Sequence, residues 1–404
     1  MDARPRRSSI AAASILRPGE PAFWLFVALV AYGAIRMASA LAELSRISSS
    51  GWALSWLLLS VYALPAFALI YYLDLYEREP LSLAIGAFIW GALAATALSL
   101  DAAGWDRVVA YVFGAEFAAR WGPAVTAPIV EETMKGAGVV LLALFARDEV
   151  DDLMDGFVYG ALCGLGFAVV EDVLYFMAAF GGTPIDVLRG FYVRVVSSGL
   201  YGHVLYTGLV GMGVASVVAQ RPGREPARRR IEAAALVLAG VGGHVLWNAP
   251  VLTSVLPVEP ITGTEWLLVP IAFTIRALPL LAFVVLAIRL ARDRERRWLD
   301  GALADELTLG GVTPQELDVL RTPSDRRAAV RDMRRRAGRS AASVLQRLQR
   351  EQVTLAMLTM RASGAPQTPA LLAQRAYCRS LRAALDAIPG AAPAGDHGVA
   401  APGR

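Results

Sequence analysis

The sequence predicts an all-α membrane protein, a polytopic bundle of about eight transmembrane helices followed by a helical cytoplasmic region. Hydrophobic residues make up 56% of the 404 residues and charged residues only 18%, and the mean hydropathy is +0.48. This composition excludes an ordinary soluble domain. Long apolar runs recur up to residue 291, and from residue 292 the chain becomes polar and rich in Arg and Ala.

Apolar segments of about 18 residues or more predict a membrane domain over residues 21–291. Its eight expected spans are 21–42, 52–73, 81–100, 122–146, 156–180, 194–219, 231–254 and 266–291. Arginines cluster in the tail of residues 1–20, in "RPGREPARRR" (221–230) and after the eighth span. Because such clusters mark the cytoplasmic side, both termini are predicted to be cytoplasmic. The loops near 101–121, 181–193 and 255–265 then face outward.

Residues 292–388 are predicted to form a cytoplasmic helical region, and residues 389–404 a disordered tail. "TPQEL" (313–317) has the form of a capping box that begins a helix, and further helices are expected over 340–361 and 370–387. The basic segment "RRAAVRDMRRRAGR" is interpreted as a solvated helix face, so no nucleic-acid partner is expected. The sequence indicates no oligomeric state.

The fourth span carries three ionisable residues, Glu131, Glu132 and Lys135, in "PIVEETMK". Each costs about 2.5–3.5 kcal/mol near the bilayer centre, which indicates a function. Lys135 is four residues after Glu131 and three after Glu132, so either pair can meet on a helix. It is also the one lysine beside 38 arginines, which suggests a site that needs a compact cation. Adjacent residues point about 100° apart, so only one glutamate is expected to face a shared centre.

Three later spans place more polar groups at a similar depth. Glu171 and Asp172 fall in the fifth span, His203 in the sixth, and His244 with Asn248 in the seventh. Glu131, Glu171, His203 and His244 each lie about 14 Å from the outer surface at 1.5 Å per residue. Glycines that would allow close helix packing surround them, at 164, 166, 199, 202, 208, 211, 213, 242 and 243.

A layer of carboxylates and imidazoles in a partly dry cavity can activate water and stabilise an oxyanion. No serine nucleophile elbow, serine–lysine dyad or HExxH zinc helix is present. Two other classes remain open. Buried carboxylates also form ion pathways in proton-coupled transporters, for which inverted repeats and broken helices would be the signal. A non-catalytic membrane scaffold would leave the histidine and acid set unexplained.

The motifs resemble those of PrsW-type intramembrane proteases, distant relatives of the CAAX prenyl endopeptidases. "EETMK" matches an EExxK signature and "FAVVE" (167–171) a second Phe-to-Glu signature. His203 and "HVLWN" (244–248) match the histidine motifs, and "LDLYEREP" (73–80) resembles the acidic turn before the third helix. The resemblance runs from about residue 22 to 290 and does not cover the C-terminal region, and the four motifs in this order make it specific.

This resemblance implies a bacterial plasma-membrane endopeptidase that cleaves membrane-anchored proteins in the lipid bilayer, with anti-sigma-factor-like regulators as suggested substrates. Glu131 and Glu132 would hold the general base, His203 would position water or substrate, and His244 with Asn248 would form the oxyanion site. Glu171 stands where CAAX endopeptidases commonly have a histidine. No cofactor is favoured, because an asparagine amide suits an oxyanion better than a metal. The alternative is a zinc site of His203, His244 and Glu132.

Overall fold

The computed structural model describes residues 14–73, 79–219, 225–250, 268–361 and 367–391. Most of the acidic turn at 73–80, the arginine residues of the tail before residue 14, the loop at 255–265 and His397 lie outside these ranges, as does most of the expected disordered tail. The described residues form two compact units, one reaching to Arg289 and the other beginning at Leu290. The boundary falls within one helix, α12 (Val269–Leu309).

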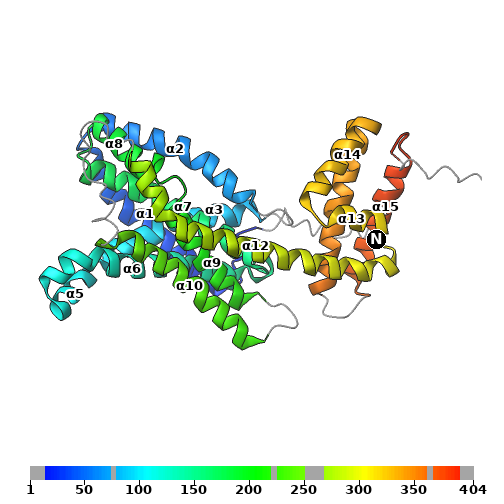
Figure 1. The fold of residues 1–404 in the computed structure, drawn as a ribbon, viewed down its shortest axis with the longest axis horizontal. Helices are drawn as coiled ribbons and strands as arrows, with labels where there is room; N and C mark the ends of the chain where they lie inside the picture. The colour runs from blue at the N-terminus through cyan, green and yellow to red at the C-terminus, as the bar shows by residue number, and fades with distance from the viewer. Residues whose placement is uncertain (1–13, 74–78, 220–224, 251–267, 362–366, 392–404) are drawn as a thin grey trace, which may run out of the picture. The chain divides into compact units, whose positions relative to one another are not determined.

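The first unit is a helical bundle, and its described residues contain no strand (Figure 1). Among the described residues, six helical segments are long and apolar enough to cross a membrane. They are α1 (Pro21–Ser45), α2 (Ser49–Tyr71), the segment from α3 (Leu81–Ile89) to Phe113, α7 (Leu153–Leu174) with its extension to Ala179, α10 (Pro226–Asn248) and α12. The expected fourth and sixth spans correspond to α6 (Ala115–Phe145), which carries the three ionisable residues, and to the 16-residue α9 (His203–Val218). The predicted polytopic helical bundle is confirmed.

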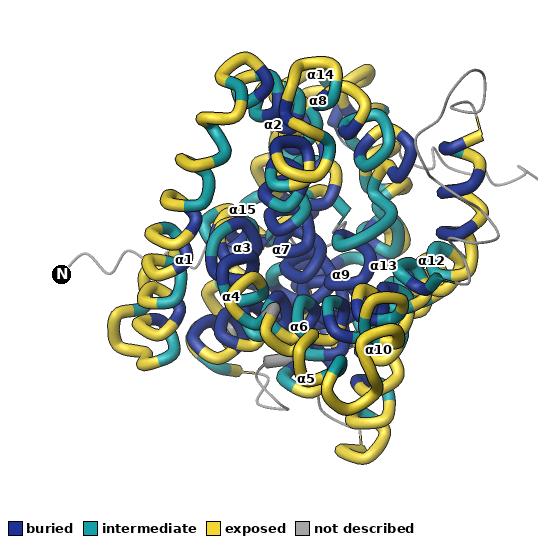
Figure 2. Tube along the Cα trace, turned by 90° about the vertical axis from the view of Figure 1, so that its left-hand side faces the viewer, coloured by how far each residue is buried: buried dark blue, intermediate teal, exposed yellow. Residues whose placement is uncertain are grey.

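Helix α7 forms the centre of this unit. Buried positions concentrate on α7 and α9 in Figure 2. In an apolar stretch of 18 residues within the segment Leu153–Ala179, 94% of the residues are buried. Gly156, Gly160 and Gly164 form a stripe on α7 at which an added Cβ would come within 2.2–2.3 Å of α9 backbone oxygens. The stripe therefore brings the two backbones together and places the start of α9, with His203, against α7.

The expected sixth span is broken, which corrects the prediction of one continuous helix over 194–219. A π-helical turn (Tyr192–Val196) leads into turns at Ser197–Gly202, and α9 begins only at His203. Gly199 and Gly202 have φ of +59° and +132°, a region in which glycine avoids the strain of other residues. These two glycines therefore end the helix rather than allow close packing, and His203 lies at a helix N-terminus.

Two segments predicted as outward loops contain helices, α5 (Trp105–Phe113) and α8 (Pro184–Phe191). Helix α5 has no buried residue and exposes Trp105 and Tyr111. Aromatic residues of this kind are enriched where a membrane meets water. The hydropathy scan missed both helices because each is too short and too polar for a span.

The second unit packs the end of α12 with α13 (Pro314–Leu320), α14 (Pro323–Arg361) and α15 (Pro369–Asp386). The predicted capping box at Thr313 is confirmed, because its side chain accepts from Glu316 N and Glu316 accepts from Thr313 N. Arg375 forms a buried two-bond pair with Glu306 at 2.7 Å. Burial raises the pKa of the Cys378 thiol to about 12, so the thiol stays protonated at neutral pH.

Candidate active site

Lys135 is the centre of a charged cluster on α6. Its side chain is fully buried, and its Nζ lies 2.6 Å from Glu132 Oε1, 3.4 Å from Glu131 Oε2 and 2.8 Å from His203 Nδ1. The ring of Phe167 covers the ammonium at 4.2 Å. The i,i+3 and i,i+4 spacings therefore pair as predicted. A wider guanidinium would not fit among these groups, which accounts for a lysine in an arginine-rich chain.

Each histidine of the cluster is oriented by a carboxylate. His203 Nε2 lies 3.0 Å from Glu171 Oε2, and His244 Nδ1 lies 3.0 Å from Glu132 Oε1. An ionised carboxylate can only accept, so we assign the proton of each ring to the nitrogen that faces it. The other nitrogens, His203 Nδ1 and His244 Nε2, lie 3.8 and 3.9 Å from Glu131 Oε2. Both unprotonated nitrogens thus face the same carboxylate.

The two adjacent glutamates have different surroundings. Glu132 is fully buried, and both of its carboxylate oxygens have partners. Its Oε1 contacts Lys135 and His244, and its Oε2 accepts a hydrogen bond from Thr207 at 2.8 Å. Glu131 keeps 13% of its side chain exposed and meets its partners through Oε2. No hydrogen bond joins Glu131 Oε1 to another residue in the described ranges. Both glutamates enter the cluster, contrary to expectation, but only Glu131 has an oxygen available for water.

Arg194 extends the cluster beyond the residues that the sequence predicted. Its Nη2 lies 2.7 Å from Glu171 Oε2, and its Nε lies 2.5 Å from Asp172 Oδ1. Its guanidinium stacks over Tyr175 at 3.8 Å from the ring centroid. The arginine therefore fixes the carboxylate that orients His203, and it acts as a positioning residue. An arginine at the edge of a predicted span, facing the pair Glu171–Asp172, was the signal that could have identified it.

Arg194→Gln is expected to lower substrate turnover about 10–100-fold. This is the usual effect of removing a group that holds a functional histidine in place through its carboxylate partner. Arg194→Lys should recover only part of this loss, because an ammonium cannot hold two carboxylates in a fixed fork. Steady-state kinetics should show a fall in kcat with little change in KM. The control is Arg189→Gln on α8, whose side chain is 70% exposed. A kcat equal to that of the control would contradict the positioning role.

Asn248 is the predicted site residue that the structure places elsewhere. It is the last residue of α10, not an interior residue of a span, and its amide donates to the carbonyl oxygen of Pro123 at 2.9 Å. Among the described residues it makes no hydrogen bond to His244 or His203. The sequence missed Tyr206 and Thr207, although both lie one turn after His203 on the same face of α9. The ring of Tyr206 stacks on His244, with centroids 4.7 Å apart.

The site has the donors of a catalytic zinc centre. Glu131, His203 and His244 each offer one ligand atom, and these atoms lie within 4.8 Å of one another. Donors around a tetrahedral zinc ion with bonds of about 2.0 Å are roughly 3.3 Å apart, so modest side-chain shifts would suffice. The structure thus groups Glu131 with the histidines, whereas the sequence suggested Glu132.

Charge and orientation also fit a divalent cation. Four carboxyl groups, those of Glu131, Glu132, Glu171 and Asp172, face one lysine and one arginine. The ionised set therefore carries excess negative charge that a divalent ion would balance. Carboxylates that hold the second nitrogen of a histidine, as Glu171 and Glu132 do, are the usual outer shell of metal-binding histidines. Lys135 competes with this arrangement, because it contacts His203 Nδ1.

Comparison with known proteins matches the region that holds this site. The family model described as PrsW family intramembrane metalloprotease matches residues 79–290, just over half of the chain. A curated relative, Protease PrsW of Geobacillus kaustophilus (strain HTA426), is 34% identical over 160 residues. That match covers 38% of this chain and 64% of the relative, less than two thirds of its length. No solved structure matches the chain.

Proposed function

The chain belongs to the PrsW family of intramembrane metalloproteases, and from this premise we propose that it hydrolyses peptide bonds of membrane-anchored proteins within the bilayer. The observation that carries the proposal is the arrangement around Glu131. Two histidines, each oriented by its own carboxylate, turn their other nitrogens toward Glu131 Oε2, while Oε1 has no hydrogen-bond partner among the described residues. Anti-sigma-factor-like regulators are the substrate group suggested by the sequence resemblance.

Glu131 is the proposed general base of the metal-free reaction. Its Oε1 accepts a proton from the attacking water, the water oxygen bonds to the substrate carbonyl carbon, and the same proton passes to the amine as the carbon–nitrogen bond breaks. Glu132 holds His244, and Glu171 with Arg194 holds His203, so both rings stay aligned through the reaction. Lys135 offsets the negative charge of the two glutamates.

We propose that His203, His244 and Glu131 hold a divalent metal ion, with zinc the best match to a His₂Glu donor set. Such an ion would supply a water that is nucleophilic at neutral pH and would polarise the substrate carbonyl. Sequence reasoning favours a metal-free reaction, and the contact of Lys135 with His203 Nδ1 supports that version. The outer-shell carboxylates and the excess negative charge favour the metal. In the metal-free version Glu131 is the base. In the metal version its carboxylate would be a ligand beside the reacting water, so Glu131→Gln would also lose the metal.

The arginine clusters support an orientation with both ends of the chain in the cytoplasm. In the described ranges these arginines include Arg17, Arg228, Arg229 and Arg230, and a further group between 292 and 297. Eight crossings, counting α6 and α9, return the chain to the side on which it began. The proposed location is the bacterial plasma membrane.

A transporter would share the buried carboxylates and the break before α9. Here, however, the break presents His203 directly to Lys135 and Glu171. A proton pathway needs neither two carboxylate-oriented imidazoles nor a common carboxylate between them. The protease therefore accounts for more of the geometry.

The test uses the purified full chain in proteoliposomes with an epitope-tagged single-span model protein. We expect two products whose masses place the cleaved bond within or beside the span. Cleavage confined to soluble parts of the substrate, or no cleavage of any single-span protein, would contradict the proposal.

A further inference from the structure

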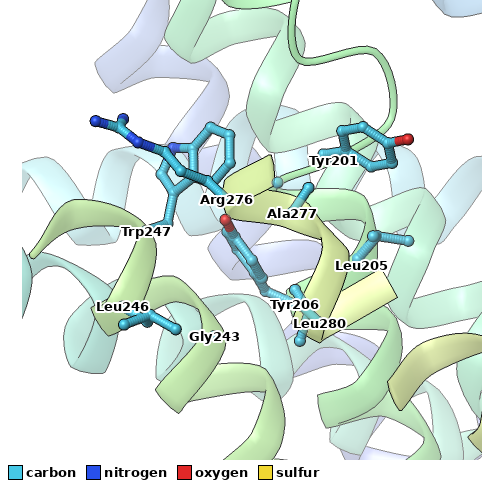
Figure 3. Close-up of a pocket in the computed structure, with 10 residues that line it drawn as sticks. Tyr201, Leu205, Tyr206, Gly243, Leu246, Trp247, Arg276, Ala277 and Leu280 are labelled. Carbon is cyan, nitrogen blue, oxygen red and sulfur yellow. The ribbon is translucent and has the colours of Figure 1, made fainter. Parts of the chain in front are cut away.

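A small cavity lies between α9, α10 and α12, within the first unit (Figure 3). Its volume is about 20 Å³, room for roughly one water-sized group. Aromatic and aliphatic side chains and two glycines form most of its wall, including Tyr206, Gly243, Trp247, Ala277 and Leu280.

The cavity adjoins the candidate active site. Gly202 and Gly243, which both line it, immediately precede His203 and His244. The ring of Tyr206 forms one wall and stacks on the imidazole of His244 at an interplanar angle of 15°. The cavity is thus one aromatic ring away from the histidine. An extended peptide advances about 3.3 Å per residue. A substrate bound at the histidines would therefore place the side chain next to its cleaved bond about one aromatic ring away from His244, where the cavity lies.

The hydroxyl of Tyr206, a residue that lines the cavity, is a polar group to which a bound ligand could form a hydrogen bond. Tyr206 is only 2% exposed, and its hydroxyl has no hydrogen bond to another residue in the described part of the chain. Figure 3 shows the ring reaching between Trp247 and the Arg276–Ala277 turn of α12, with the hydroxyl at its tip. A group that enters the cavity would therefore find a donor there.

We propose that this cavity is a substrate subsite that receives the side chain next to the cleaved bond and accepts only glycine, alanine or serine. The proposal rests on the proposed protease function and adds the substrate class, a membrane segment with a small residue at the cleavage point. A methyl or hydroxymethyl group matches the cavity volume, and a serine hydroxyl would pair with Tyr206. Leucine or phenylalanine would displace the wall.

Leu280 on α12 sets the size of the cavity from one side. It lies opposite Gly243 on α10, where an added Cβ would come within 2.7 Å of Leu280 Cδ1. Leu280→Ala therefore enlarges the subsite by three carbon atoms, and Gly243→Ala narrows it. The two changes should move substrate preference in opposite directions, which a general loss of folding could not do.

The experiment uses single-span model substrates that carry Gly, Ala, Ser, Leu or Phe at the position beside the mapped cleavage site. Wild-type chain in proteoliposomes is expected to cleave the Ala substrate more than about 10-fold faster than the Leu substrate, within the range for unmatched methylenes in a tight pocket. Leu280→Ala should bring this ratio to within about threefold, and Gly243→Ala should favour Gly over Ala. The control is Leu278→Ala, two residues away on α12 and 51% exposed, which should keep the wild-type ratio.

An unchanged Ala-to-Leu ratio in Leu280→Ala, or the same shift in Leu278→Ala, would overturn the subsite while leaving the protease assignment in place. Wild-type chain that cleaves Leu and Phe substrates as fast as Ala would also overturn it. If wild-type chain cleaves none of the substrates, the protease function itself fails and the subsite with it.

Discussion

Glu131→Gln is expected to reduce cleavage of a single-span substrate about 10³-fold or more, the upper part of the range for a missing general base, with no loss of thermal stability. Glutamine keeps the shape of the side chain but cannot accept the proton at Oε1. Because Glu131 is partly exposed and pairs with Lys135 only at 3.4 Å, its neutralisation leaves the stronger pair of Lys135 and Glu132 intact.

Glu132→Gln should lower the thermal stability of the protein, unlike Glu131→Gln. Comparing the two variants tests the separate roles of the two carboxylates. This change leaves a fully buried lysine without its 2.6 Å partner, and breaking such a pair costs about 3–5 kcal/mol. A thermal unfolding scan in detergent should therefore show a lower midpoint for Glu132→Gln and a wild-type midpoint for Glu131→Gln. Glu116→Gln, at an exposed position on the same helix, is the matched control for both measurements. Glu131→Gln with more than a tenth of wild-type activity would exclude Glu131 as the base.

The second large effect is expected from the histidines. Purified chain should contain about one zinc ion per molecule by elemental analysis, and His203→Ala and His244→Ala should each lose both the metal and the activity. Removal of one of three ligands leaves an incomplete site, and metal binding depends on the complete donor set. Asn248→Ala should retain the metal, because its amide contacts Pro123. His397→Ala is the matched control, as the third histidine of the chain, outside the described residues.

Metal content separates the two versions of the mechanism independently of activity. Full cleavage in strong chelator by a chain without bound zinc would support the metal-free reaction at Glu131, with Lys135 providing the positive charge. Zinc that persists in His244→Ala would place the metal elsewhere. Either result would leave the roles of Glu131 and Arg194 open to their own tests.

Hydropathy and spacing predicted much of the fold, because both depend on short stretches of chain. A run of apolar residues predicts a span whatever surrounds it, and the i,i+3 and i,i+4 spacings predicted the pairing of Lys135 with both glutamates without any tertiary contact. The break before α9 was missed, because "SSGLYG" carries no charged residue and lies within a longer run that is apolar on average. Only the backbone shows that Gly199 and Gly202 take positive φ.

The sequence by itself determined the membrane class and the helical architecture, and it predicted Glu131, Glu171, His203 and His244 at one depth. Only the tertiary structure decided which oxygen of which glutamate is available, that Arg194 holds Glu171, that Asn248 points to Pro123, and that Tyr206 borders a cavity. The reason is physical. Helix periodicity sets the direction of a side chain from its own helix, whereas its partners depend on the rotation and approach of separate helices, which glycine contacts such as Gly164 against His203 establish.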